Sequence, residues 1–220
     1  MGAFYEDLNP ERHSDEYRFH ADSIALEHSR ALMDNSCRRS KLDWALEAAR
    51  LGYKVFPLGR HPIIWEQAAT DSPKKISSWW KFGGIGEGCN IAAALRPSEI
   101  TIVELIFPAG RKGIELLRDV VADLPTTRTV ITPRGIHIHL RGVTASSLQL
   151  PFQGVSIKSA GDFALLPGSQ EYIDAHHSRL APYYWKSLGP ISSVPQQLLA
   201  EMAKDEHAGM ATRLPKRATR

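Results

Sequence analysis

The sequence predicts a mixed α+β fold, and three observations support this prediction. Segments with the 3.6-residue period of an amphipathic helix occur at 41–52 and 110–124. Short runs of β-branched and other apolar residues occur at 90–95 and 100–107. The two kinds of segment do not alternate regularly, which favours an α+β arrangement or a mixed sheet over a regular parallel one.

The segment KLDWALEAARLG (41–52) is the clearest predicted helix. Its apolar residues fall on one face, and Gly52 suits the position just after a helix C-terminus. The elements expected next are a strand at 53–58, a loop at 59–75, a helix at 76–82 capped near Ser72, a glycine-rich loop at 83–88, and strands at 90–95 and 100–107 joined by a turn. The elements expected after these are the helix at 110–124, a hairpin of strands 127–133 and 136–142 around Arg134-Gly135, two short strands within 154–168, a strand at 182–187 and a helix at 194–207.

Composition bounds the class of protein. With 43% hydrophobic residues, the 220-residue chain can form a core that a disordered protein lacks. No apolar run approaches the ~20 residues that span a bilayer, and the polar N-terminus does not resemble a secretory signal, so no membrane location is expected. Cys37 and Cys89 lie far apart and match no metal-binding spacing. We therefore expect two reduced thiols in a cytoplasmic protein.

The chain is expected to have three parts. These are an N-terminal arm and helix at 1–40, one domain at 41–190, and a C-terminal helix and basic tail at 191–220. The basic residues of the tail are Arg213, Lys216, Arg217 and Arg220. Such a tail either contacts nucleic-acid phosphates or is a solubilising end. The net charge of +3 is compatible with nucleic-acid binding but does not require it.

Six segments in a fixed order carry a resemblance to a known family. They are ALEAARLGYKVFPLGRHP, TDSPKKISSWW, CNIAAAL, ITIVELIFPAGRKGIELL, TPRGIHIHL and VSIKSAGDFALLPGS. Together they span roughly Leu42 to Leu188 and resemble the bifunctional DNA primase/polymerase N-terminal (prim-pol) domain of the archaeo-eukaryotic primase superfamily. The resemblance implies a primase-polymerase-like domain with an RRM-like sheet flanked by helices, which makes or extends nucleic-acid strands from nucleoside triphosphates. It also implies a role in DNA replication, in a setting such as a plasmid, phage or other mobile element.

The metal-binding positions that the resemblance implies are largely lost in this chain. In the family, an Asp-x-Asp pair and a third acid hold two divalent metal ions. The pair falls on Glu104 and Ile106, and the third acid falls on Ser156. In-line phosphoryl transfer needs two cations held by hard oxygen ligands, and only Glu104 provides a carboxylate. The sequence therefore predicts a degenerate active site without a bound cofactor, whereas an active centre would use Mg²⁺ or Mn²⁺.

The candidate residues for binding phosphate are Arg134, His137 and Lys158. His137 matches the family's small-x-His motif, which contacts nucleotide phosphates, and Lys158 stands where the family often has a basic residue. The alternative for His137 is a packed remnant of the ancestral site. His139 falls on the same strand face as His137, but two histidines without further ligands do not make a zinc site.

Glu104 lies in the apolar run IVELIF, where an unpaired carboxylate is unfavourable to bury. It therefore either faces a wet cleft or pairs with a base such as Lys158 or Arg134, as a salt bridge in place of the metal ions. A shifted alignment would bring in Asp162 as a second metal ligand, but its Gly-Asp turn favours bonding to backbone amides.

Two further features resemble ligand-binding elements. The glycine-rich run GGIGEG (83–88) resembles a phosphate loop, but it lacks the Lys-Ser/Thr of a P-loop, does not fit a Rossmann fingerprint and is interpreted as a plain loop. Trp65 and Trp80 are candidates for stacking on bases, although packing in a core is the favoured interpretation.

Three functions remain open from the sequence. The favoured one is a catalytically inactive primase-polymerase-like protein that binds DNA or RNA, a nucleotide, or a replication or regulatory protein, the last through residues 1–40. The second is a divergent, active DNA primase/polymerase that uses Glu104 and His137, with Asp162 beside one metal ion. The third is a protein-protein interaction module with no nucleic-acid role. The oligomeric state is not predicted.

Overall fold

The computed structural model describes residues 39–59, 65–107, 110, 126–144, 148–149, 154–173 and 180–200. The chain divides into two compact units, Met1–Arg39 and Ser40–Arg220, and nearly all described residues belong to the second. The predicted arm up to residue 38, the basic tail and, apart from Gly110, the helix predicted at 110–124 lie outside the described residues.

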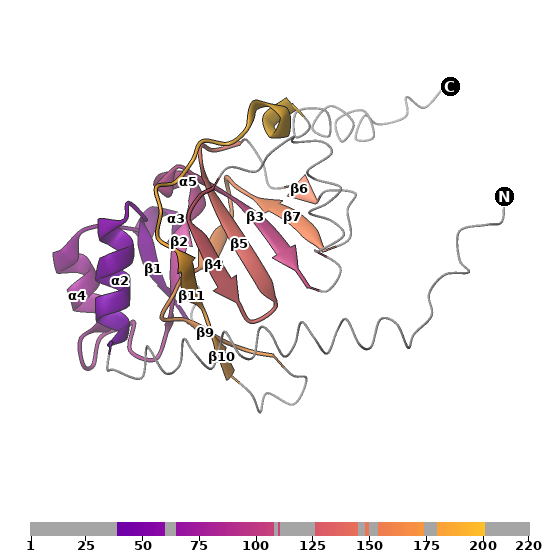
Figure 1. Cartoon of the computed structure of the whole chain (residues 1–220). Helices are drawn as coiled ribbons and strands as arrows, with labels where there is room; N and C mark the ends of the chain where they lie inside the picture. The colour runs from indigo at the N-terminus through magenta and orange to yellow at the C-terminus, as the bar shows by residue number, and fades with distance from the viewer. Residues whose placement is uncertain are drawn as a thin grey trace, which may run out of the picture. The chain divides into compact units, whose positions relative to one another are not determined.

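The second unit combines helices with antiparallel sheets, which confirms the predicted α+β class (Figure 1). The strands are β1 Val55–Leu58, β2 Asn90–Ala94, β3 Ile100–Ile106, β4 Thr129–Thr132, β5 Gly135–Arg141, β6 Leu148–Gln149, β7 Val155–Lys158, β8 Phe163–Leu165, β9 Gln170–Tyr172, β10 Leu180–Pro182 and β11 Tyr184–Ser187. The largest sheet has six strands in the order β11-β4-β5-β3-β7-β6. A second sheet has the order β1-β2-β8, and β9 pairs with β10 in a separate two-stranded ribbon.

Two helices pack beside the three-stranded sheet. α2 (Lys41–Arg50) begins with a capping box, in which the Ser40 hydroxyl accepts from the Asp43 N–H and the Asp43 carboxylate accepts from the Ser40 N–H. α4 (Pro73–Trp80) begins three residues before the predicted start at 76, with Ser72 at its N-cap as predicted but without a capping side-chain bond, and with proline in its first turn. α2 contacts α4, β1 and β2, and Figure 1 shows α2 and α4 side by side to the left of β1.

Two short helices were not predicted. α3 (Trp65–Ala68) lies within the segment predicted as a loop at 59–75. α5 (Leu95–Ser98) takes the place of the predicted turn before β3 and ends where Glu99 adopts a left-handed conformation. A single helical turn contains too few residues to show a 3.6-residue period. The expectation of irregular connections was therefore wrong at both places.

The six-stranded sheet has an apolar cluster on each face. Val103 and Leu105 of β3 belong to one cluster, which also contains Leu198 of the helical segment 196–200. Ile102 belongs to the other cluster, together with residues of α2, α4, β1 and β2. Because successive side chains of a strand point to opposite faces, Glu104 shares its face with Ile102. The candidate site therefore lies on the side of the sheet that faces the three-stranded sheet.

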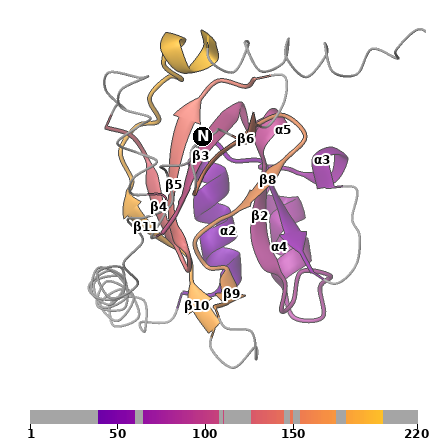
Figure 2. The same cartoon turned by 90° about the vertical axis from the view of Figure 1, so that its right-hand side faces the viewer.

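The chain crosses between the two sheets after β7. β7 pairs with β3 in the larger sheet, whereas β8 pairs with β2 in the smaller one. The turn between them is closed by a hydrogen bond of 3.0 Å from the Asp162 N–H to the Ser159 carbonyl. Figure 2 shows β8 beside β2, with β9 and β10 at the lower end of the view. The crossing brings β8 and the ribbon that follows it to the face of the larger sheet that carries Glu104.

No helix among the described residues is both long enough and apolar enough to pass through a bilayer.

The predicted hairpin around Arg134-Gly135 is confirmed, and it leads to a prediction about stability. β4 pairs with β5, and β5 pairs with β3 from Arg141 opposite Ile100 to Gly135 opposite Ile106. A Cβ atom at Gly135 would lie 1.9 Å from the Leu105 carbonyl oxygen, a backbone atom that cannot rotate away. We expect Gly135→Ala to lower the free energy of unfolding by about 3 kcal/mol, as measured by urea denaturation.

Gly189→Ala is the matched control for this substitution. The nearest atom to a Cβ at Gly189 is the Ser187 Oγ at 3.5 Å, which is ordinary contact. It is expected to change stability by less than about 0.5 kcal/mol. Equal stability of the two variants would contradict the close approach of β3 and β5 at Gly135.

Candidate functional site

Three strands bring together the four positions where the family resemblance places the active site. Glu104 on β3 lies directly opposite His137 on β5 and directly opposite Ser156 on β7. Ile106 lies two residues further along β3 on the same face, opposite Gly135. The structure therefore places His137, Glu104 and Ser156 in a row across the middle of the six-stranded sheet, with Ile106 beside Glu104 along β3.

The Glu104 carboxylate accepts three hydrogen bonds from protein side chains. Its Oε1 accepts from the Lys158 ammonium at 2.8 Å and from His137 Nε2 at 3.0 Å. Its Oε2 accepts from the Ser156 hydroxyl at 2.8 Å. The Glu104 side chain is 17% exposed and that of Lys158 is 31% exposed. Of the two bases considered from the sequence, Lys158 is the one that pairs with Glu104.

These contacts decide the protonation of Glu104. Burial raises its pKa, but the hydrogen bonds from His137 and Lys158 and the charge of Lys158 lower it more strongly, so the pKa lies well below its ordinary value. Burial lowers the pKa of His137 in spite of the carboxylate beside it. Near pH 7 the ring is therefore neutral and donates its Nε2–H to Glu104. Its Nδ1 has no hydrogen-bond partner within the described part of the chain.

A cavity of about 340 Å³ opens beside Glu104. The residues that line it are Glu104, Ile106, Thr132, Arg134, His137, Lys158, Phe163, Ala164, Leu165, Glu171 and Tyr183. The three candidate phosphate-binding residues, Arg134, His137 and Lys158, are all among them. The residues from β8 close the cavity on the side of the three-stranded sheet.

Sequence reasoning missed Glu171 and Tyr183. The Arg134 guanidinium donates to Glu171 Oε1 at 3.0 Å, and the Tyr183 hydroxyl donates to Glu171 Oε2 at 2.8 Å. Burial and the neighbouring Glu171 raise the pKa of Tyr183, so its hydroxyl remains a donor. The cavity therefore contains two carboxylates, each with a basic partner of its own. No signal in the sequence distinguishes Glu171, because β9 is too short to show a pattern.

The donor set around Glu104 does not fit the two metal ions that the family resemblance implies. Ile106 has no ligand atom, and the Ser156 hydroxyl gives its hydrogen to Glu104. The Lys158 ammonium takes the position beside the carboxylate where a cation would bind. Mg²⁺ requires several hard oxygen ligands, and the described residues contain no group of three or more His, Cys, Asp or Glu side chains able to hold a metal ion.

Asp162, the alternative metal ligand, lies in the turn before β8. It is not one of the described residues that line the cavity. Its N–H donates to the Ser159 carbonyl, and its own carbonyl accepts from the Leu95 N–H. The candidate nucleic-acid contacts of the basic tail, which are Arg213, Lys216, Arg217 and Arg220, lie outside the described residues.

A buried cluster of side chains lies next to His137, further along β5. The rings of His137 and His139 lie 6.4 Å apart, on one strand face as predicted. His139 is fully buried, and its Nδ1 is 2.6 Å from the Tyr53 hydroxyl. Burial raises the pKa of Tyr53 to about 12, so the hydroxyl is the donor and Nδ1 the acceptor. Arg128 lies over the rings of Tyr53 and Trp185, at 5.6 and 5.9 Å from their centroids.

Acid is expected to destabilise the domain through His139. Burial is the main cause that holds the pKa of His139 well below its ordinary value, and electrostatic repulsion from the nearby His137 and Arg128 adds to it. As the pH falls, His139 therefore becomes protonated in the unfolded chain before it does so in the folded chain. The free energy of unfolding then falls below about pH 6.5, by up to about 1.4 kcal/mol per pH unit for one histidine. Urea denaturation between about pH 7 and pH 5 measures this slope. His139→Gln, which keeps an acceptor for Tyr53, should give a shallower slope, and an unchanged slope would assign the acid sensitivity to other groups.

Comparison with protein families matches residues 45–197 to Prim-Pol, the bifunctional DNA primase/polymerase N-terminal family. A comparison with curated proteins found no match. The matched region covers more than half of the chain and contains every residue that lines the Glu104 cavity. The chain therefore belongs to the Prim-Pol family of bifunctional DNA primase/polymerase N-terminal domains.

Proposed function

We propose that this chain is a catalytically inactive member of the Prim-Pol family that binds nucleic acid without extending it. The observation that carries this proposal is the engagement of Glu104 by Lys158, His137 and Ser156. Nucleotidyl transfer in the family implies two metal ions that stabilise the attacking and leaving oxygens. In this chain a lysine ammonium neutralises the one carboxylate that is left for them.

An ammonium group cannot replace a metal ion chemically. It can neutralise Glu104 and tie β3 to β7, but it offers no open coordination position for a substrate oxygen. Ile106 adds an aliphatic side chain to the cavity wall where a second carboxylate would stand. The arrangement therefore balances the charge of Glu104 with Lys158 but supplies no Lewis acid, which the reaction requires.

The cavity still contains groups that can bind phosphate. The side chains of Arg134 and Lys158 are 61% and 31% exposed and border the same cavity. Each is paired with a carboxylate at the cavity wall, and a phosphate group can compete for the same donors through charge-assisted hydrogen bonds. Nucleic acid is the favoured ligand because the family is one of DNA primases and polymerases, and the net charge of +3 is compatible with it.

One observation favours a second function, a divergent nucleotidyltransferase. Glu171 supplies another carboxylate to the cavity that holds Glu104. This carboxylate is itself occupied, since Arg134 and Tyr183 both donate to it. Catalysis would require both salt bridges to open before a metal ion could bind, and the free energy of both pairs opposes that change.

Two assays on one protein preparation test the proposal. Fluorescence anisotropy measures the binding of labelled single- and double-stranded DNA with and without Mn²⁺ and a nucleoside triphosphate. Nucleotide incorporation is measured on primed and unprimed templates with Mg²⁺ or Mn²⁺. We expect salt-sensitive binding that does not depend on metal, and no incorporation above the background of a protein-free control.

The outcomes separate the three functions. Incorporation that disappears in Glu104→Gln would establish the divergent enzyme and overturn the proposal. The absence of any salt-dependent DNA or RNA binding would leave a protein-protein interaction module, and would overturn it as well.

A further inference from the structure

The loop between α4 and β2 presents an aromatic ring to solvent. Phe82 is 95% exposed and Ile85 is 66% exposed, and among the described residues these are the two most exposed large apolar side chains. The preceding residues Trp79 and Trp80 are each only 8% exposed and pack in the core. An exposed ring adds no buried apolar surface to the core, so the ring of Phe82 is accessible to a binding partner.

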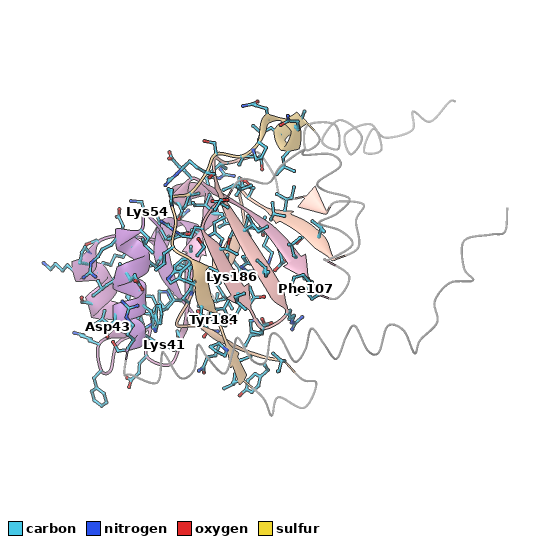
Figure 3. All side chains as sticks on the ribbon, in the orientation of Figure 1. Lys41, Asp43, Lys54, Phe107, Tyr184 and Lys186 are labelled. Carbon is cyan, nitrogen blue, oxygen red and sulfur yellow. The ribbon has the colours of Figure 1, made fainter. Side chains whose placement is uncertain are left out.

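Hydrogen bonds hold the backbone of this loop in place. The Glu87 carboxylate accepts from the Gly83 N–H at 2.7 Å, and the Trp79 carbonyl accepts from the Gly86 N–H at 2.8 Å. At the far end of the loop, the ammonium of Lys41, which is labelled at the start of α2 in Figure 3, donates to the Cys89 carbonyl at 2.7 Å. The ring of Phe82 therefore projects from a pre-organised loop.

Close packing explains why the loop is rich in glycine. A Cβ atom at Gly84 would lie 2.2 Å from the Trp79 carbonyl oxygen, and one at Gly86 would lie 3.0 Å from the same atom. The glycines let the loop fold back onto the end of α4. The side chains of Phe82 and Ile85 on this loop are largely exposed to solvent.

Basic side chains accompany the exposed ring. Lys74 and Lys75 on α4 and Lys81 immediately before Phe82 are all exposed. The stretch 71–90 contains two acidic residues. The first, Asp71, pairs with Lys54, and the second is Glu87, whose carboxylate accepts from the loop backbone. The lysines are therefore not neutralised by acids of their own segment.

We propose that Phe82 is a stacking platform for an unpaired base of single-stranded nucleic acid, with Lys81 contacting a neighbouring phosphate. An aromatic ring stacks on any base, and an adjacent ammonium adds salt-dependent attraction to the backbone. Paired bases inside a duplex are already stacked on both faces, so this site selects single strands. The proposal rests on the proposed function in one respect, namely that the chain binds nucleic acid.

The site is distinct from the Glu104 cavity. Neither Phe82 nor Lys81 is among the described residues that line that cavity. For Trp80 the sequence favoured packing in a core over stacking on bases, and Trp80 is buried in the core. Phe82, two residues later, carries the exposed ring instead.

Anisotropy titration of a labelled oligothymidine of about 20 nucleotides tests the proposal, because thymine has little self-stacking. The full chain is compared with Phe82→Ala, Phe82→Leu and Phe82→Trp. We expect Kd to rise at least about fivefold in both Phe82→Ala and Phe82→Leu, and to stay within about twofold of the original in Phe82→Trp.

Leu188→Ala, which alters another exposed apolar side chain (52% exposed), is the matched control and should leave Kd unchanged. Lys81→Gln should reduce the slope of log K against log salt by about one.

Each outcome decides a separate point. If the unaltered chain binds no single strand, this proposal and the proposed function both fail. If it binds but Phe82→Ala binds equally well, only the stacking site is overturned. If Phe82→Leu binds like the unaltered chain while Phe82→Ala does not, the contact is apolar and not stacking, which also overturns it. Because Phe82 is almost fully exposed, its variants are expected to keep their folding, and circular dichroism checks this.

Discussion

Replacement of Glu104 by alanine is expected to lower the free energy of unfolding by about 3 kcal/mol at pH 7. The substitution leaves the Lys158 ammonium, the His137 Nε2–H and the Ser156 hydroxyl without their common acceptor. Removal of one partner from a buried ion pair typically costs about 3–5 kcal/mol. The lower value applies here because the Lys158 side chain is 31% exposed and can turn toward water.

Urea denaturation at neutral pH measures this loss, and two variants serve as controls. Glu104→Gln keeps a carbonyl acceptor of the same shape, so the expected loss is only about 1 kcal/mol. Glu104→Leu combined with Lys158→Met removes both charges and should be more stable than Glu104→Ala, because no unpaired ammonium remains. A stability of Glu104→Ala within about 0.5 kcal/mol of the original would show that the carboxylate is not the centre of this network.

The double variant Ile106→Asp/Ser156→Asp is expected to gain a site for divalent metal ions. It places carboxylates at the two positions to which the family resemblance assigns the other two acids, next to Glu104 on the same face of the sheet. The single positive charge of Lys158 does not balance three neighbouring carboxylates, so the metal-free variant should be less stable than the original chain. Mn²⁺ at about 100 times its Kd would then stabilise the folded variant by about 2.7 kcal/mol.

Thermal unfolding with increasing Mn²⁺ measures this gain. The melting temperature of the double variant should rise with Mn²⁺, whereas that of the unaltered chain should not. Ile106→Asn/Ser156→Asn has nearly the same shape without the charges, and should not respond. An equal response of the Asp and Asn variants would mean that the ion binds elsewhere, and the assignment of these positions would then be wrong.

The sequence could predict which side chains of one strand share a face and where the hairpin turns, but not which strands pair across the site. The alternation of IVELIF and IHIHLR fixes which side chains share a face. The hairpin at Arg134-Gly135 fixes the register of β4 against β5. From the sequence, the basic partner of Glu104 could be Lys158 or Arg134. The structure shows Lys158 in that place, because Arg134 pairs with Glu171 instead.

Other features depend on contacts that no local pattern reveals. Glu171 and Tyr183 reach the cavity only because the chain crosses from β7 to β8 and so carries β9 to the same place. The two strands predicted within 154–168, β7 and β8, have similar short apolar patterns, yet they belong to different sheets. The exposure of Phe82 was not predicted because no local pattern distinguishes it from the buried Trp79 and Trp80 just before it.

The proposal that a salt bridge between Glu104 and Lys158 stands where the family holds its metal ions can be tested by titration with Mn²⁺. The electron paramagnetic resonance signal of free Mn²⁺ then measures how much of the ion the unaltered chain binds. We expect the same free Mn²⁺ signal for the unaltered chain and for Glu104→Gln up to about 1 mM of the ion. Binding of one or two ions per chain that is lost in Glu104→Gln would contradict it, and would mean that the salt bridge opens to admit a working metal centre.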